Sequence, residues 1–290
     1  MGRVIHSIAA AAATVVLLAG MRAAGQESRT AAGAAQPVSP LFAQSAGRML
    51  DRQFPSPDIS YLLLDAQTGA TLAARWPEAE LPVPLGSLVK PFTALAYARS
   101  HGYLYPAYVC HGKAGGCWQP RAHGRLNIVS ALAFSCNSYF RNLSSRLSAA
   151  EMREVAAQFG LDPPGPGVAG AALMGLGDQW PIAPLRMAHA YLELARRGDE
   201  PGVREILAGL ADSAQWGTGS AVGRAVPRLS VLAKTGTAEC HHSPRAPGDG
   251  FVIAMVPAEQ PQLLLMVSVH GSPGSRAAQT AGDMLCLLEQ

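Results

Sequence analysis

The stretch Pro84-Leu85-Gly86-Ser87-Leu88-Val89-Lys90-Pro91-Phe92 places a serine and a lysine three positions apart at the start of an apolar helical pattern. The pattern continues to Ser100, which predicts a helix over residues 87–100. Residues three apart on a helix share a face, so Ser87 and Lys90 are expected to lie side by side. Pro91 is compatible with this helix because it falls in the first turn.

The serine and the lysine of this pair are residue types that can act as a nucleophile and its general base. A serine hydroxyl is a poor nucleophile until a base takes its proton. An ordinary lysine, with a pKa of about 10.4, is charged at neutral pH and cannot be that base. Burial or a second cation lowers a lysine pKa, and Lys234 offers such a cation. Gly86 allows close backbone approach, and the helix N-terminus suits a developing oxyanion. On its own, such a pair arises mostly by chance.

A second polar triplet, Ser135-Cys136-Asn137, follows the apolar segment 131–134. Ser135 is suited to relay a proton between Lys90 and a leaving group. Asn137 carries an amide that both donates and accepts, which matches a peptide backbone. The competing interpretation is a polar helix end with Asn137 as its cap.

A third segment, Lys234-Thr235-Gly236-Thr237, follows an apolar strand pattern. Lys234, Thr235 and Thr237 offer a cation and two hydroxyls that can hold a carboxylate. Gly236 removes a side chain where a substrate backbone can lie. The backbone N–H groups of Thr237 and Ser87 are candidates for an oxyanion hole. The alternative is a solvated strand end, but three such segments in this order together make coincidence improbable.

Around these segments the chain reads as two early strands, three late strands and a helical stretch between them. The predicted strands are 59–65, 70–76, 229–233 running into Lys234, 251–256 and 262–270, and the predicted helices are 43–53, 87–100, 126–134, 149–159, 184–197 and 277–288. Short turns within both strand pairs predict antiparallel hairpins. The expected fold is α/β of the α+β type: an antiparallel sheet of about five strands flanked by helices, with an inserted all-helical lobe.

The N-terminus has the order of an export signal: Arg3, an apolar run over residues 4–20, then small residues up to Gly25. Residues 1–25 are therefore expected to be a cleaved signal peptide or a retained membrane anchor. Residues 26–44 read as a linker. We expect residues 45–290 to form one domain, with the sheet from 45–80 and 229–290 and the lobe from about 87–228. The protein is expected to be exported and extracytoplasmic.

Composition excludes some partners. The 290 residues are 49% hydrophobic and 15% charged, with a net charge of +3. So small a net positive charge argues against nucleic acid as a partner.

The five cysteines leave at least one unpaired, and Cys110 with Cys117 is either a small disulfide loop or two free thiols. Two sequence clusters contain potential metal ligands: Cys110, His111, Cys117 and His123, and then Cys240, His241 and His242. Neither has an established zinc spacing, so we expect loop structure, no metal and no cofactor.

The match to known proteins extends beyond the triplets. The segments that carry it are 84–92, Cys117-Trp118, His123-Gly124, 131–140, Gly175-Leu176-Gly177, 184–188, Ala190-Tyr191, Gly217-Thr218-Gly219 and 234–239. Over roughly residues 45–290 the chain resembles penicillin-binding protein transpeptidase domains of the serine β-lactamase and D,D-peptidase superfamily. The resemblance implies a serine acyl-enzyme formed on D-Ala-D-Ala stem peptides of peptidoglycan, and covalent trapping by β-lactams.

Carried over by position, Ser87 is the nucleophile, Lys90 the general base, and Ser135 and Asn137 the residues of proton transfer and substrate positioning. Lys234, Thr235, Gly236 and Thr237 form the substrate-binding segment. Transpeptidation rather than carboxypeptidation is implied by the family alone. Because no glycosyltransferase-like segment precedes residue 45, we expect a separate glycosyltransferase as partner.

Two other functions compete. A serine β-lactamase differs by fast deacylation, but no convincing Glu-x-x-Leu-Asn motif of class A lies between Ser135 and Lys234, and Asn137 departs from the Ser-x-Val pattern of class D. A non-catalytic β-lactam sensor or wall-synthesis scaffold would be favoured by degraded motifs, whereas all three are intact.

Overall fold

The computed structural model describes residues 39–239 and 248–289. The predicted export segment and residues 26–38 of the predicted linker lie outside the described residues, as does the Cys240–His242 cluster. The last residues of the predicted linker, 40–44, are helical instead, because the first helix begins at Pro40 behind the N-cap Ser39. Within the described ranges, no helix has the length and apolar character needed to cross a membrane.

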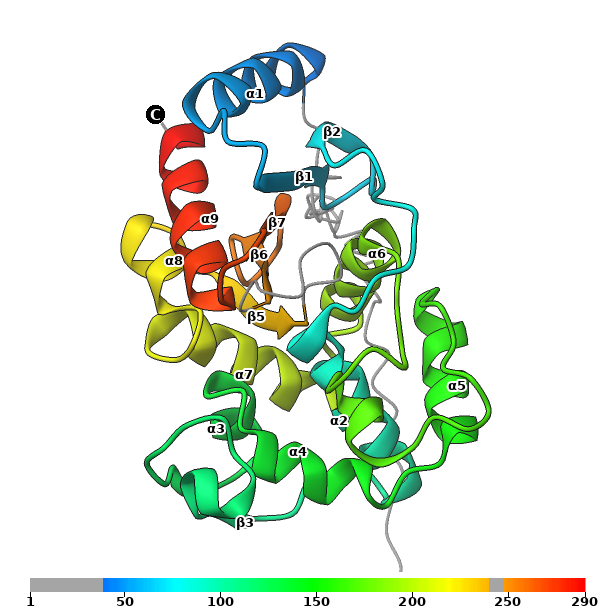
Figure 1. Cartoon of the computed structure of the whole chain (residues 1–290). Helices are drawn as coiled ribbons and strands as arrows, with labels where there is room; N and C mark the ends of the chain where they lie inside the picture. The colour runs from blue at the N-terminus through cyan, green and yellow to red at the C-terminus, as the bar shows by residue number, and fades with distance from the viewer. Residues whose placement is uncertain (1–38, 240–247, 290) are drawn as a thin grey trace, which may run out of the picture. The chain divides into compact units, whose positions relative to one another are not determined.

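A five-stranded antiparallel sheet forms the centre of the domain (Figure 1). Its strand order is β2-β1-β7-β6-β5. The strands are β1 (Ile59–Asp65), β2 (Thr71–Arg75), β5 (Leu232–Ala238), β6 (Asp249–Val256) and β7 (Leu263–Val269). The expected five-stranded antiparallel sheet is confirmed, and β5, which carries the Lys234 segment, is an edge strand.

The turn between β1 and β2 shows why the early hairpin forms. The Asp65 carboxylate accepts hydrogen bonds from the backbone N–H groups of Gln67 and Thr68 at 2.8 and 2.9 Å. Gly69 follows with φ +77°, a left-handed conformation that glycine adopts without strain. This is an Asx-type turn, so the predicted hairpin is confirmed.

Both faces of the sheet are covered, and β1 supplies alternate residues to each. Tyr61 and Leu63 pack into a core formed with α1 (Pro40–Gln53), α8 (Ser220–Ala225) and α9 (Gly274–Leu288). Leu62 and Leu64 point to the opposite face, toward the larger core shared with the inserted helices. Side chains of a strand alternate between faces, so a strand buried on both faces is apolar almost throughout.

The insertion between β2 and β5 is mostly helical. Its helices are α2 (Lys90–Ser100), α3 (Ile128–Ala133), α4 (Asn137–Ser144), α5 (Ala149–Phe159), α6 (Pro184–Arg196), α7 (Val203–Gln215) and α8, with 3₁₀ turns η1 (Gly86–Val89), η2 (Gly112–Gly115) and η3 (Gly170–Met174). In Figure 1, α2 runs among α4, α5 and α7.

The all-helical expectation needs a correction here, because β3 (Tyr108–Cys110) pairs with β4 (Gly124–Leu126) in a separate two-stranded ladder. Strands of three residues are too short to show an alternating pattern in the sequence. The sequence analysis also assigned no helix to the segment that forms α7 and α8. α7 packs against both α3 and β5, so it joins the insertion to the sheet.

Candidate active site

The nucleophile segment begins as a 3₁₀ turn rather than as the predicted α-helix. The Lys90 backbone N–H donates to the Ser87 carbonyl oxygen, closing the tighter i→i+3 turn. Pro91 explains the difference: four residues after Ser87, it has no N–H for the α-helical bond to that carbonyl. Regular α-helix therefore starts at Lys90, within the first turn after the serine.

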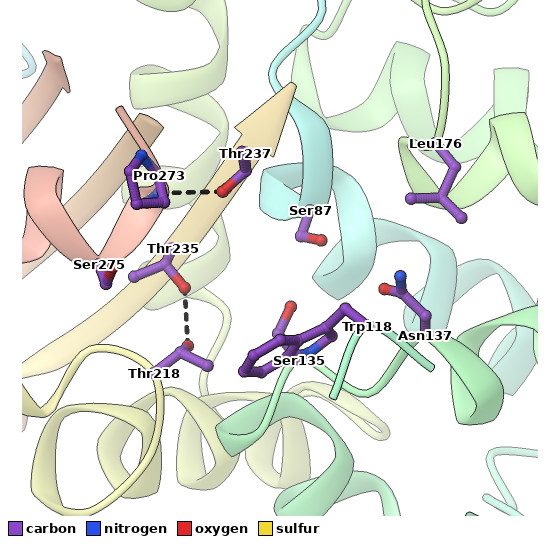
Figure 2. A pocket seen from close by; sticks show the side chains of 12 residues that line it. Ser87, Trp118, Ser135, Asn137, Leu176, Thr218, Thr235, Thr237, Pro273 and Ser275 are labelled. Atoms are coloured by element: carbon purple, nitrogen blue, oxygen red, sulfur yellow. Dashed lines mark hydrogen bonds between the residues drawn. The ribbon is translucent and has the colours of Figure 1, made fainter. Parts of the chain in front are cut away.

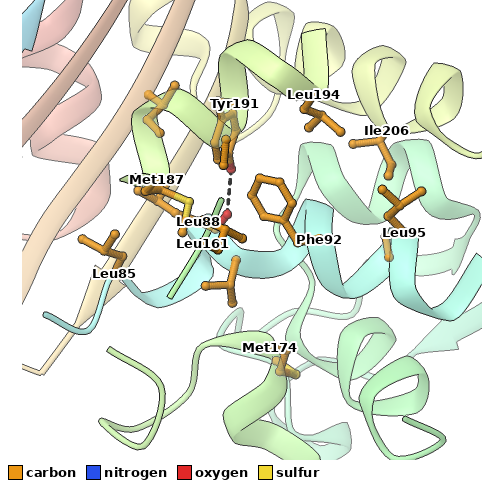
Figure 3. Close-up of a cluster of buried hydrophobic side chains, with 14 of the residues drawn as sticks. Leu85, Leu88, Phe92, Leu95, Leu161, Met174, Met187, Tyr191, Leu194 and Ile206 are labelled. Carbon is orange, nitrogen blue, oxygen red and sulfur yellow. Dashed lines mark hydrogen bonds between the residues drawn. The ribbon is translucent and has the colours of Figure 1, made fainter. Parts of the chain in front are cut away.

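A buried hydrophobic cluster holds this turn in place (Figure 3). The Tyr191 hydroxyl of α6 donates to the Leu88 carbonyl oxygen at 2.8 Å. Phe92 packs edge-on against Tyr191 and Phe159, with ring centroids 5.5 and 5.4 Å apart. Because both apolar packing and a buried hydrogen bond fix the segment, Ser87 is presented from a rigid support.

Lys90 is completely buried and reaches the second motif. Its Nζ donates to the Ser135 carbonyl oxygen at 2.8 Å, to the Ser135 Oγ at 3.3 Å and to the Asn137 Oδ1 at 2.6 Å. The ring of Phe140 lies 5.3 Å from this nitrogen. The structure therefore brings the first and second motifs into direct contact, as the sequence analysis expected.

Ser135 sits in a left-handed backbone conformation, with φ +51°. It ends α3: its N–H donates to the Leu132 carbonyl oxygen, and the Cys136 N–H donates to the Ala131 carbonyl oxygen. This is a Schellman motif, in which glycine usually occupies the left-handed position. A serine there costs about 1 kcal/mol, so the fold retains strain at the residue whose hydroxyl faces both lysines.

The alternative in which Asn137 caps a helix end is wrong. Asn137 is the first residue of α4, and α3 is instead capped at its N-terminus by Asn127, which accepts from the Ser130 N–H at 2.9 Å.

The third motif completes the contact from β5. The Lys234 Nζ donates to the Ser135 Oγ at 2.9 Å and to the Thr235 carbonyl oxygen at 2.7 Å. The Thr235 hydroxyl donates to the Thr218 hydroxyl at 2.7 Å. The hydroxyl of Thr237 accepts from the Gly274 N–H at 2.9 Å. The three motifs thus meet at the Ser135 hydroxyl.

Burial sets the charge state of the two lysines. It lowers the pKa of Lys90 from its ordinary value to about 7. Burial, together with the positive charge of Lys90, lowers the pKa of Lys234 well below its ordinary value. A neutral amine is therefore accessible at neutral pH, which a surface lysine does not offer.

Two glycines allow the backbone of the 3₁₀ turn η1, which carries Ser87, to lie directly against the backbone of β5. A Cβ built on Gly86, which has φ +57°, would stand 2.2 Å from the Thr237 carbonyl oxygen. A Cβ on Gly236 would stand 2.4 Å from the Leu85 carbonyl oxygen. Only glycine fits at either position, and the result is that Ser87 and Thr237 lie next to each other across the gap.

These residues open onto a cavity of about 410 Å³. Figure 2 shows the Ser87 hydroxyl pointing into it, toward Asn137 and Ser135. The cavity is lined by Ser87, Trp118, Ser135, Asn137, Leu176, Thr218, Thr235, Gly236, Thr237, Pro273, Gly274 and Ser275. Lys90 and Lys234 lie beneath this surface. Among the described residues that line the cavity there is no Asp, Glu, His or Cys, so the cavity itself offers no metal-ligand set.

The sequence analysis gave no role to the outer walls. Trp118, Leu176 and Thr218 each lie in a segment of the family resemblance, but no residue chemistry singled them out. The Trp118 indole N–H donates to the Phe134 carbonyl oxygen at 3.2 Å, which anchors this ring at the cavity wall, where it is 50% exposed.

A sequence model described as the penicillin-binding protein transpeptidase domain matches residues 59–285. The chain belongs to the penicillin-binding protein transpeptidase family. Domains of this family bind peptidoglycan and β-lactams outside the cytoplasm. No curated protein matches the chain significantly.

Solved structures agree on the fold. The D,D-transpeptidase domain of a peptidoglycan glycosyltransferase from Eggerthella lenta has a TM-score of 0.65 at 18% identity, covering 85% of this chain and 80% of that one. PBPA from Mycobacterium tuberculosis has a TM-score of 0.66 at 18% identity, covering 86% of this chain and 79% of that one. PBP2 of Helicobacter pylori, in complex with MreC, has a TM-score of 0.68 at 16% identity, covering 85% of this chain and 62% of that one.

Proposed function

We propose that the protein is a penicillin-binding serine acyltransferase that acts on D-Ala-D-Ala stem peptides of peptidoglycan, a D,D-transpeptidase or D,D-carboxypeptidase. One observation carries this proposal: Lys90 and Lys234 share the Ser135 hydroxyl directly behind a cavity into which Ser87 points. That arrangement supplies a nucleophile, a buried amine and a hydroxyl relay within one site.

In the proposed acylation, Ser87 Oγ attacks the carbonyl carbon of the penultimate D-Ala while neutral Lys90 takes its proton. Among the described residues the Ser87 hydroxyl has no hydrogen-bond partner. In the proposal, the hydrogen bond from the Ser87 Oγ to the Lys90 Nζ therefore forms when substrate enters. The backbone N–H groups of Ser87 and Thr237 stabilise the oxyanion. The proton then passes through Ser135 to the leaving D-Ala amine, and the acyl group stays on Ser87.

Substrate binding is assigned to β5 and to Asn137. Lys234, Thr235 and Thr237 hold the terminal carboxylate, whose negative charge favours the protonated form of Lys234. Gly236 leaves room for the substrate backbone, and the Asn137 amide hydrogen-bonds its peptide group. An acceptor amine or water then releases the acyl group, giving transpeptidation or carboxypeptidation respectively.

The cellular setting follows from the same family. We propose that residues 1–25 direct export, that residues 26–44 are a linker and that residues 45–290 act outside the cytoplasm. The Helicobacter pylori PBP2 structure contains MreC, and another similar structure belongs to a peptidoglycan synthase complex that coordinates polymerization and crosslinking. By analogy, a separate glycosyltransferase is the proposed partner of this chain.

Time-resolved intact-mass spectrometry of the purified protein after brief exposure to penicillin tests the proposal. A stable adduct that peptide mapping places on Ser87 is the expected result. An adduct lost quickly with release of hydrolysed drug would make the protein a β-lactamase. The complete lack of an adduct would leave a non-catalytic scaffold and would refute the proposed chemistry.

A further inference from the structure

Three cysteines and a histidine converge beside the second motif, outside the catalytic cavity. Cys110 ends β3, Cys117 follows η2, His123 precedes β4, and Cys136 lies before α4. The three sulfur atoms and one imidazole nitrogen all lie within 4.8 Å of one another. The cysteines are buried, and none of the four residues lines the cavity described above.

Three of the separations between these atoms match those of a tetrahedral zinc site. With Zn–S distances of about 2.3 Å and a Zn–N distance of about 2.05 Å, tetrahedral angles place two sulfurs about 3.8 Å apart and a sulfur and nitrogen about 3.6 Å apart. The Cys117 and Cys136 sulfurs are 3.8 Å apart. The His123 Nδ1 lies 3.5 Å from the Cys110 sulfur and 3.6 Å from the Cys117 sulfur.

The surroundings hold these ligands from several directions. The Gly112 N–H donates to the Cys110 sulfur at 3.4 Å, as backbone amides do to metal-bound thiolates. The His123 ring stacks on Phe134, with centroids 4.7 Å apart and planes at 19°. Among the described residues the His123 Nε2 has no hydrogen-bond partner, so stacking, and not a polar contact at that nitrogen, fixes the direction of Nδ1.

A disulfide explains this cluster less well. A disulfide needs sulfurs about 2.05 Å apart, and it would join two of the cysteines while leaving the third thiol and the imidazole beside it. In the structure Cys110, Cys117 and Cys136 are free. Three thiols and one imidazole nitrogen that surround one point form a donor set that zinc prefers.

We propose that Cys110, Cys117, His123 and Cys136 bind one structural zinc ion. Four protein ligands close the coordination sphere, which is typical of structural rather than catalytic zinc. Binding converts three thiols to thiolates and releases their protons, while His123 binds as the neutral imidazole through Nδ1. The sequence analysis named Cys110, Cys117 and His123 as potential ligands of one cluster but expected no metal there, because Cys136, the fourth ligand, was interpreted only as the middle residue of the second motif.

The consequence for the active site, which rests on the proposed function, is one of positioning. Cys136 stands between Ser135 and Asn137, the two residues that Lys90 contacts. A metal ion on the Cys136 sulfur ties this strained connection to the β3–β4 ladder. It thereby holds the proton relay and the substrate amide at a fixed distance from Lys90, without itself contacting substrate.

Metal analysis of the full-length protein tests the site directly. Protein purified under reducing conditions without chelators is expected to contain one zinc per chain by elemental mass spectrometry. After chelation, added Co²⁺ should give the d–d and thiolate-to-cobalt absorption of a tetrahedral site. Cys136→Ser should lose the metal, whereas Cys286→Ser, which changes the partly exposed free cysteine outside the cluster, should keep it.

Failure of the reduced wild-type protein to bind either Zn²⁺ or Co²⁺ would overturn the proposal, whether or not Cys136→Ser folds. A native mass lower by two hydrogens, with a disulfide mapped between two of the three cysteines, would also overturn it. Metal removal should lower Tm and slow β-lactam acylation, with Zn²⁺ restoring both. Stoichiometric zinc in a protein that forms no adduct would refute the proposed function and leave this inference standing.

Discussion

Lys90 and Lys234 donate to the same oxygen, the Ser135 Oγ, at 3.3 and 2.9 Å. Burial lowers the pKa of both lysines, and the positive charge of Lys90 lowers that of Lys234 further. In the proposed mechanism, the pair therefore supplies an amine that accepts a proton and, once a carboxylate enters, a cation that binds it.

Ser87→Ala should abolish covalent β-lactam labelling, because the only proposed nucleophile is removed. The matched control is Ser275→Ala, a serine that lines the same cavity outside the three motifs. Labelling followed by intact mass should fall below detection in the first variant and persist in the second. Persistent labelling of Ser87→Ala would mean that another residue is the nucleophile.

Ser135 combines two features that a pair of variants separates. Ser135→Ala and Ser135→Gly both remove the hydroxyl, so each should slow acylation by about 10²–10⁴-fold. Glycine relieves the left-handed conformation and alanine does not, so Ser135→Gly should be more stable than Ser135→Ala by about 1 kcal/mol in denaturant unfolding. Equal stability would show that the φ of +51° carries no strain, and unchanged acylation would remove the relay role.

The second-order acylation rate should depend on the protonation of Lys90. Its pKa is lowered to about 7, so the amine is charged and inactive below that pH and neutral above it. The rate should rise about tenfold per pH unit below pH 7 and level off above it. Lys90→Arg stays protonated and should be inactive throughout. A flat wild-type profile between about pH 5.5 and 8.5 would contradict the base assignment.

Lys234→Ala should weaken acylation mainly through binding. Loss of a charge-assisted contact of about 1.5–3 kcal/mol raises the dissociation constant of the non-covalent drug complex by about 10–150-fold. Stopped-flow acylation at increasing drug concentration separates this constant from the first-order acylation step. Lys234→Arg, which keeps the charge, should lose less affinity, and an unchanged dissociation constant in Lys234→Ala would refute the carboxylate role.

Gly86→Ala should impair both folding and acylation, because its Cβ would meet the Thr237 carbonyl oxygen at 2.2 Å. Gly102→Ala is the control, since Gly102 has a similar φ of +62° with open space around it. The control should lose about 1–2 kcal/mol of unfolding free energy and retain acylation. Gly86→Ala should lose more stability and most of its acylation rate. Similar behaviour of the two variants would show that the close approach is unimportant.

Local sequence patterns were sufficient to predict much of the fold of this protein. Strand β1 lies where the apolar run 59–65 predicted it, and the Asx turn after Asp65 shows why the hairpin signal was reliable. The three motifs meet as expected from their chemistry. Strands β3 and β4 were missed because three residues carry no period, and α7 because its face is defined by packing on α3 and β5.

Other features depend on tertiary contacts that no local pattern contains. A serine gives no sign of the left-handed backbone that Ser135 adopts, since glycine is the usual signal for it. Trp118 and Thr218 become cavity walls only when distant loops meet at β5. Cys136 joins Cys110 and Cys117 for the same reason: the fold, and not the spacing, brings the three sulfurs together.

The backbone contact between Gly86 and the Thr237 carbonyl bears on how resistance to β-lactams can evolve in this protein. The proposed oxyanion donors are main-chain N–H groups, which among amino-acid substitutions only proline deletes, and the glycines beside them have no room for a larger residue. Under the proposed function, mutations that keep acyl transfer but exclude a drug are therefore expected at the cavity walls. Trp118, Leu176 and Thr218 are the positions at which selection under antibiotic has side chains to change.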